Sequence, residues 1–252
     1  REQNRFVLQP NTLEWDFIVC HLKKYWTPEQ ICGRWELLYP ERKKLCIATI
    51  YRAIKAKRFP KITAKNNLRR RDKHRCHQNS NYNTIHPDRI IPEWIDEIKQ
   101  RVRIGDWEGD TVYGGVGKGL LVTLVDRKTR FLCAGLIHSR SSTETREMIE
   151  MLLKDMPVKS ISLDNGSEFS EFRELEQNLN TEVYFAEPHK PWQRGTNENT
   201  NDILRFLFPK GYNFHSLDNE TLQNIVLSIN LRPKKCLGWL SPFEAFFGVA
   251  LA

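Results

Sequence analysis

The sequence has no hydrophobic run long enough to cross a membrane. Its longest apolar stretches, 119–125 and 131–137, have the length of β-strands, whereas a transmembrane helix needs roughly 20 consecutive apolar residues. The first residues, Arg-Glu-Gln-Asn-Arg-Phe, include neither an initiator Met nor the apolar segment of a secretory signal. We therefore expect a chain that makes no contact with a membrane.

Paired cysteines are missing as well. The six cysteines show no CxxC pair and no regular spacing: Cys20, Cys32, Cys46, Cys76, Cys133 and Cys236. Scattered cysteines of this kind are typical of reduced, intracellular thiols. The cluster of His74, Cys76, His77 and the more distant His86 lacks the two-plus-two ligand spacing of a structural zinc site. We interpret that cluster as part of a basic, solvated linker.

Acidic residues are nearly absent between positions 55 and 75. Ten lysines and arginines stand there against one acid, Asp72, a local charge of +9 in a chain whose net charge is +8. Such a basic segment attracts a polyanion by releasing the counterions of nucleic acid. Within it we select Arg69, Arg70 and Arg71 as candidate DNA contacts. The alternative is a charged segment that is only solvated.

Residues 1–58 are predicted to form short helices. Leu13, Phe17 and Cys20 recur at helical spacing. Thr27 and Pro28 then occupy positions typical of an N-cap and of the first residue of a second helix.

A third predicted helix has two unlike faces. Its apolar residues share one side: Ile47, Ile50, Tyr51 and Ile54. Thr49, Arg52 and Lys55 lie on the other side, where they could enter a DNA groove. We expect residues 1–58 to form a helix-turn-helix-like DNA-binding module with these three residues as DNA contacts. The alternative is an exposed polar face without a partner.

Residues 59–100 are predicted to be a basic linker followed by a short helix. Residues 101–252 alternate strand and helix patterns. Strands are expected at 107–113, 119–126, 130–138, 158–163 and 183–186, and helices at 142–154, 170–179, 197–208 and 218–230. Three consecutive strands, followed by strands that alternate with helices, predict an α/β fold with a mixed sheet flanked by helices.

Three carboxylates stand where such a fold can bring them together. Asp110 lies in the first strand, Asp164 ends an apolar strand, and Glu198 opens a helix after Gly195. Cleavage and joining of phosphodiesters use two hard cations about 3.5 to 4 Å apart, and magnesium prefers carboxylate oxygens. Strand alternation puts Asp106 and Glu108 on the same face as Asp110, so spacing alone does not choose among these three.

The motifs around these acids occur in the order of a known family. They read GDWEGDT, LVDRKTR, LDNGSEF, VYFAEPHKPWQRGTNENTN, LFPKG and INLRPKKCLGWLSPFEAF, with Ile229 where Leu is more usual. The match runs from about Trp26 to Phe246, and 33 residues separate Asp164 from Glu198. The chain resembles the acidic-triad (DDE) transposases and retroviral integrases, and in detail the bacterial insertion-sequence-thirty family.

This resemblance implies a ribonuclease-H-like core in which Asp110, Asp164 and Glu198 hold two Mg²⁺ or Mn²⁺ ions. The implied partners are double-stranded DNA, at the inverted-repeat ends of a mobile element and at the target, and further copies of the chain that pair two ends. Lys190 and Arg194 flank the third motif and are candidate DNA contacts, with a structural ion pair as the alternative. The implied location is the bacterial cytoplasm, at the nucleoid when DNA is bound.

Two features depart from the family pattern. The usual first helix-turn-helix is missing, and Asp202 stands where Gly is common, so its charge either adds to the metal site or faces solvent. The expected function is a transposase that binds element ends, cleaves DNA and transfers strands. The alternative is a transposase-derived DNA-binding protein without catalysis. A simple nuclease leaves the basic helical module unexplained.

Overall fold

The computed structural model describes residues 8–68, 96–186 and 195–251. They belong to two compact units, one formed by Arg1–Gln78 with Leu231–Ala252 and the other by Asn79–Asn230. No helix within these described ranges is both long enough and apolar enough to span a membrane. The two units are described separately below.

The first unit is helical. Its elements are α1 (Leu13–Lys23), α2 (Pro28–Leu38), α3 (Ile47–Lys55), α4 (Ala64–Asn67), the 3₁₀ turn η4 (Lys235–Leu237) and α10 (Pro242–Phe247). The predicted start of α2 is confirmed, because Thr27 and Gln30 exchange side-chain to backbone hydrogen bonds in a capping box. The core of the unit is apolar, with Ile31 and Trp35 of α2 completely buried.

The buried faces of α1 and α3 differ from those predicted. In α1 the buried residues are Ile18 and Leu22. Of the predicted apolar stripe, Phe17 packs against the core, but Leu13 is 42% exposed and Cys20 is exposed as well, so their placement on the buried face was wrong. A helix packs against its neighbours with one face only. In α1 the buried residues on that face come one position later in the sequence than the predicted ones.

The buried face of α3 is narrower than predicted. Ile50 and Ile54 are buried as expected, but Ile47 is 40% exposed and Tyr51 is 46% exposed. Ala53, whose side chain is small enough for close packing, is buried instead. The exposed surface of α3 is therefore wider than the prediction and includes an aromatic ring.

The helical module extends beyond residue 58, where the sequence prediction ended it. Phe59 and Ile62 are 2% and 1% exposed and belong to the helical core. The side-chain amide of Asn67 donates to the carbonyl of Leu22 at 3.3 Å. Residues 59–68 are thus part of the module and not of a linker, because their apolar side chains complete its core.

The C-terminal segment belongs to the helical unit, whereas the predicted boundary at 101–252 had placed it with the sheet. Arg34 and Glu244 form a buried two-bond ion pair, with N–O distances of 3.0 and 2.8 Å. Burial raises the pKa of Glu244, but hydrogen bonds from Arg34 and from backbone groups outweigh it and hold the pKa at about 2. Trp239 lies so close to Gly33 that a Cβ there would be 2.1 Å from its ring.

The second unit is built on a five-stranded sheet with the order β3-β2-β1-β4-β5. The strands are β1 (Asp106–Tyr113), β2 (Leu120–Asp126), β3 (Leu132–Ile137), β4 (Ser160–Leu163) and β5 (Glu182–Phe185). The first three pair antiparallel, whereas β4 is parallel to β1 and β5 is parallel to β4. Each strand lies within three residues of its predicted bounds.

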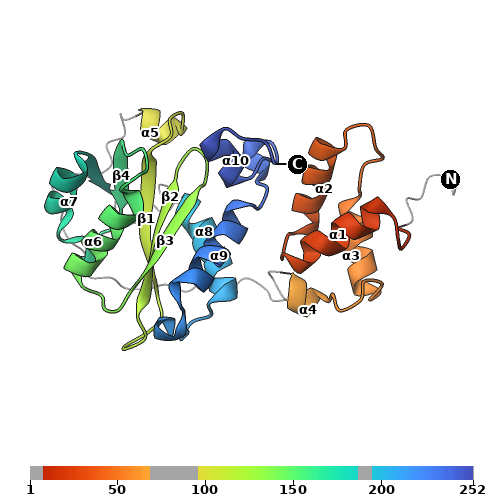
Figure 1. Cartoon of the computed structure of the whole chain (residues 1–252), viewed down its shortest axis with the longest axis horizontal. Helices are drawn as coiled ribbons and strands as arrows, with labels where there is room; N and C mark the ends of the chain where they lie inside the picture. The colour runs from red at the N-terminus through yellow and green to blue at the C-terminus, as the bar shows by residue number, and fades with distance from the viewer. Residues whose placement is uncertain (1–7, 69–95, 187–194, 252) are drawn as a thin grey trace. The chain divides into compact units, whose positions relative to one another are not determined.

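Helices cover both faces of this sheet (Figure 1). The helices of this unit are α5 (Asp96–Gln100), α6 (Ser142–Leu153), α7 (Phe172–Leu179), α8 (Gly195–Leu207) and α9 (Asn219–Asn230), with the 3₁₀ turns η1 (Ser167–Phe169) and η3 (Phe214–Ser216). On one face α6 packs so closely that a Cβ at Gly135 would be 2.1 Å from Met148. On the other, α8 and α9 bury Leu204 and Val226 against β2 and β3. The predicted α/β fold, a mixed sheet flanked by helices, is confirmed.

Candidate active site

Asp110 and Asp164 lie side by side at one edge of the sheet. Glu108 of β1 pairs in register with Ser162 of β4, and two residues further along these parallel strands the same register sets Asp110 beside Asp164. A Cβ at Gly109 would be 2.5 Å from a side-chain carbon of Leu163, as expected of neighbours in that register. Both aspartates are half-buried. Neighbouring strands are about 4.8 Å apart, so the two carboxylates can serve one site.

The Asp164 loop is held by its own polar groups. The backbone N–H of Gly166 donates to Asp164 Oδ1 at 3.0 Å, and the amide of Asn165 donates to the carbonyl of Ala186 at 3.1 Å. The first bond is an Asx turn, which reverses the chain directly after the strand. These two bonds fix Asp164 at the end of β4. They also attach its loop to Ala186, the residue that follows β5.

Helix α8 runs along β1 with its polar side toward the strand. The backbone N–H of Asn197 donates to Glu108 Oε2 at 3.1 Å. One turn later Asn201 Nδ2 donates to Asp110 Oδ2 at 2.6 Å, and another turn later Arg205 donates to the carbonyl of Tyr113 at 2.9 Å.

Glu198 belongs to the first turn of α8, between the two asparagines that bind β1. Its side chain lies outside what the structure describes. The backbone of this turn is hydrogen-bonded to the strand that carries Asp110, so the start of α8 lies against β1 where that strand passes the end of β4.

The two other acids of β1 have structural partners. Asp106 is completely buried and accepts hydrogen bonds from Arg103 and Ser160. Glu108 is equally buried and pairs with Arg127 at 2.6 Å, besides capping α8. Removing one partner of such a buried pair leaves the other charge uncompensated, so both acids have a structural role. Of the three acids on this face, only Asp110 is partly accessible.

Two arginines border the aspartates. Burial lowers the pKa of Arg205 from its ordinary value, and the charge of Asp110 opposes that change. Hydrogen bonding to Glu168 raises the pKa of Arg140, and the charge of Asp164 adds to this effect. Both cations are thus close enough to the carboxylates to partly offset their charge.

The residues at this edge fit a divalent metal. Asp110 and Asp164 supply hard carboxylate oxygens, and Asn201 Oδ1 is a buried acceptor that no hydrogen bond satisfies. Oxygen donors of this kind are what Mg²⁺ prefers, and an orphaned buried oxygen calls for a partner such as an ion or water. Within the described ranges no group of three or more His, Cys, Asp or Glu side chains could hold a metal, and the Glu198 side chain is not among them.

Three of the predicted DNA-contact residues lie within the described part of the chain. In α3, Arg52 and Lys55 are exposed and Thr49 is half-buried, so the three reach the surface of the helical unit. The remaining candidates lie outside the described residues: Arg69, Arg70, Arg71, Lys190 and Arg194.

Sequence reasoning missed Asn201 and the pair of Arg140 with Glu168. Asn201 follows Glu198 by three residues, a helical spacing that could have identified it. No local pattern could have found the Arg140–Glu168 pair, because it joins a loop to the turn η1, 28 residues apart in the sequence. Asp202, the unusual acid of α8, is exposed.

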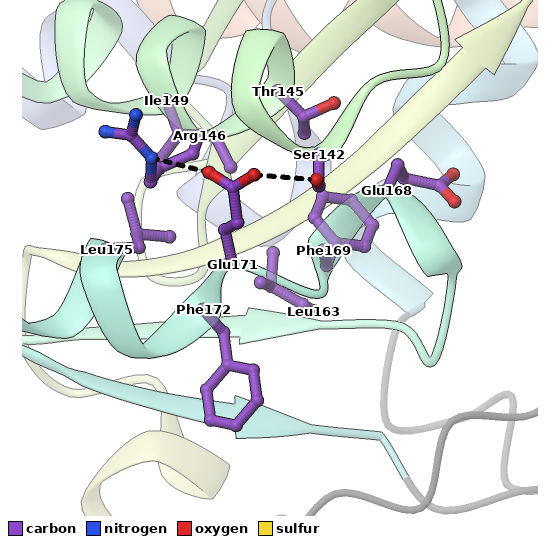
Figure 2. A pocket seen from close by; sticks show the side chains of 10 residues that line it. All are labelled: Ser142, Thr145, Arg146, Ile149, Leu163, Glu168, Phe169, Glu171, Phe172 and Leu175. Carbon is purple, nitrogen blue, oxygen red and sulfur yellow. Dashed lines mark hydrogen bonds and ion pairs between the residues drawn. The ribbon is translucent and has the colours of Figure 1, made fainter.

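A small pocket between α6 and α7 is a separate feature (Figure 2). In it Glu171 accepts hydrogen bonds from Ser142 and Arg146 at 2.8 and 2.9 Å. Glu168 points away from this cluster. Neither Asp110 nor Asp164 lines the pocket, whose polar groups tie α6 to α7.

The mixed sheet with acids at one edge defines an integrase-like class of protein, and comparisons with known proteins agree. The integrase core domain family matches residues 103–191. The fold is similar to that of a chain in the intasome of simian T-cell lymphotropic virus in complex with PP2A regulatory subunit B56 gamma. That likeness has a TM-score of 0.50 at 20% identity, and it covers 68% of this chain and 62% of the other.

Relatives in sequence narrow the class. The transposase for insertion sequence element IS4351 of Bacteroides fragilis is 33% identical over 91% of this chain and 71% of its own length. Transposase InsI for insertion sequence element IS30A of Escherichia coli is 31% identical over 91% of this chain and 63% of its own length. The chain belongs to the DDE transposases of bacterial insertion sequences. Its match spans 47% to 73% of the length of the insertion-sequence relatives.

Proposed function

We propose that this chain binds the inverted-repeat ends of a mobile DNA element, cleaves DNA there and joins the freed 3′ end to target DNA. The observation that carries the proposal is the register that sets Asp110 beside Asp164, together with the start of α8 that is bound to the same strand. Family membership supports the same activity. Asp110, Asp164 and Glu198 are the proposed metal ligands.

The site's own residues prepare it for this chemistry. Asn201 holds one oxygen of Asp110, and Glu108 holds the first turn of α8 through the backbone of Asn197. Both anchors are partly or fully buried, so the ligands sit on rigid elements. Two bound Mg²⁺ or Mn²⁺ ions would activate an attacking oxygen and stabilise the leaving oxygen. No covalent bond between protein and DNA is required.

The helical unit is the proposed DNA-binding module. Its helix α3 exposes Arg52 and Lys55 beside Thr49, side chains that can contact base edges in the major groove. The arginines at 69–71 and the pair of Lys190 and Arg194 are proposed to contact phosphates. Because two ends must be joined, we infer that copies of the chain assemble on DNA at the nucleoid.

A DNA-binding protein that has lost catalysis is the alternative. It is disfavoured because half-buried carboxylates repel each other, so a chain without metal chemistry has no physical reason to keep Asp110 and Asp164 in register. A cleavage assay separates the two. The chain should nick a duplex that carries its element end in Mg²⁺, and should join the 3′ end to a second duplex. Binding of the end without either product at any Mg²⁺ or Mn²⁺ concentration would favour the alternative.

A further inference from the structure

Arg140 lies in the loop between β3 and α6 and is half-exposed. Its Nε and one terminal nitrogen both donate to Glu168 Oε2, at 3.0 and 2.6 Å. The exposed fraction of the side chain is 48% for Arg140 but 3% for Glu168. The carboxylate is therefore enclosed by the protein, whereas part of the guanidinium faces solvent.

Glu168 borders the two proposed metal ligands. Its Oε1 accepts a hydrogen bond from Thr111, the residue after Asp110, at 3.0 Å. A Cβ at Gly166 would be 2.5 Å from Glu168 Oε2 and 2.9 Å from Asp164 Oδ1. The oxygen that holds Arg140 is thus a close neighbour of Asp164.

The way Arg140 is held leaves donors for another molecule. A guanidinium has five N–H groups in a fixed fork, and Glu168 occupies the edge formed by Nε and one terminal nitrogen. Among the described residues Arg140 has no other hydrogen-bond partner. The second edge, formed by the two terminal nitrogens, matches the spacing of two phosphate oxygens.

We propose that Arg140 contacts a phosphate of the DNA strand being cut, within one nucleotide of the cleaved bond, and that Glu168 is the positioning residue that aims it. This inference rests on the proposed function. The negative charges of Asp110 and Asp164 would repel a phosphate. Arg140, which Glu168 holds in a fixed position beside them, offsets that repulsion. If the pair were only structural, Arg140 would neutralise a buried acid and touch no substrate.

The test uses Arg140→Lys, which keeps a charge opposite Glu168 but loses the fork. Its control is Arg146→Lys. Arg146 also pairs with carboxylates, through Nε with Glu171 at 2.9 Å and through a terminal nitrogen with Glu150 at 2.8 Å, and it lines the pocket of Figure 2, which neither Asp110 nor Asp164 lines. We expect single-turnover cleavage of an end duplex to fall on the order of 10²-fold for Arg140→Lys and to change little for Arg146→Lys. Thermal unfolding should stay near wild type for both.

Duplexes with one neutral methylphosphonate at each position around the cleaved bond locate the contact. At the contacted position the neutral group and Arg140→Lys should not add, whereas at all others their losses should add. The loss caused by Glu168→Gln and the loss caused by the neutral group should likewise not add at that position. Additive losses at every position would overturn the inference and leave a structural pair.

The same duplex series, measured as binding in Ca²⁺, separates this inference from the proposed function. If wild type binds the end but does not cleave it in Mg²⁺ or Mn²⁺, the proposed function fails, and non-additive binding at one phosphate still supports the contact by Arg140. Absence of binding to any duplex would overturn both.

Discussion

Helices α3 and α8 have similar amphipathic patterns but use their polar sides in opposite ways. In α3, Ile50 is buried while Arg52 and Lys55 are exposed. In α8, Leu204 is completely buried, and the polar side, represented by Asn201, is bound to β1. An exposed polar face is available to another molecule, whereas a polar face folded onto a sheet organises a site within the protein.

This difference predicts that changes in α8 and its strand partners affect chemistry or stability, while changes in α3 affect recognition. Binding and cleavage should therefore be separable by mutation.

The largest effect is expected at the carboxylates. Asp110→Asn, Asp164→Asn and Glu198→Gln should each abolish cleavage, because loss of a metal ligand removes several kcal/mol of stabilisation, more than a hundredfold in rate. Fold and affinity for end DNA should remain near wild type, since each change conserves volume. Cleavage assays, filter binding and thermal unfolding check the three expectations. A variant with the wild-type rate would remove that residue from the site.

Glu108→Gln should act on stability. It removes the negative charge that is paired with the buried cation of Arg127, and breaking a buried ion pair costs about 3 to 5 kcal/mol. It also weakens the cap on the first turn of α8. Denaturant unfolding measures this cost. The free energy of unfolding of the surface variant Arg52→Ala should stay within about 0.5 kcal/mol of wild type. Equal losses of stability in both variants would contradict the difference drawn between α3 and α8.

Arg52→Ala should reduce recognition. Arg52 folds back onto its own helix, with hydrogen bonds to Ala48 and Thr49 at 3.3 and 3.2 Å. A base contact is worth about 1 to 3 kcal/mol, so affinity should fall more for the element end than for random DNA, and basal cleavage should survive. Competition binding at one fixed salt concentration checks this. Equal losses on both duplexes would make α3 a phosphate clamp.

The smallest effect is expected for Asp202→Asn. Asp202 is exposed on α8, so we expect its charge to face solvent and not to contribute to the metal site. Cleavage rate and its Mg²⁺ dependence should match wild type. A shift of the Mg²⁺ midpoint would show that this charge does act on the site.

Much of this arrangement could be predicted from sequence, because local patterns encode it. Thr27 with Pro28 and the apolar run before Asp164 marked a helix start and a strand end correctly. The bond from Asn201 to Asp110 spans 91 residues, and the pair of Arg34 with Glu244 spans 210. Such contacts depend on how elements pack, which periodicity does not encode.

The choice among the three acids of β1 shows the same limit. Alternation places Asp106, Glu108 and Asp110 on one face, and only the packed structure distinguishes them by burial and partners. The family pattern selects Asp110, and the burial of the other two acids supports that proposal.

The most direct test of the proposed site is the metal dependence of Asp110→Cys and Asp164→Cys. Thiolate is a poor ligand for Mg²⁺ and a better one for softer metals such as Mn²⁺. We predict that both variants are inactive on an end duplex in Mg²⁺ and regain cleavage in Mn²⁺, while Asp202→Cys is active in both. Wild-type cleavage by Asp110→Cys in Mg²⁺, or the same Mn²⁺ stimulation in wild type and variants, would contradict direct metal binding by these aspartates.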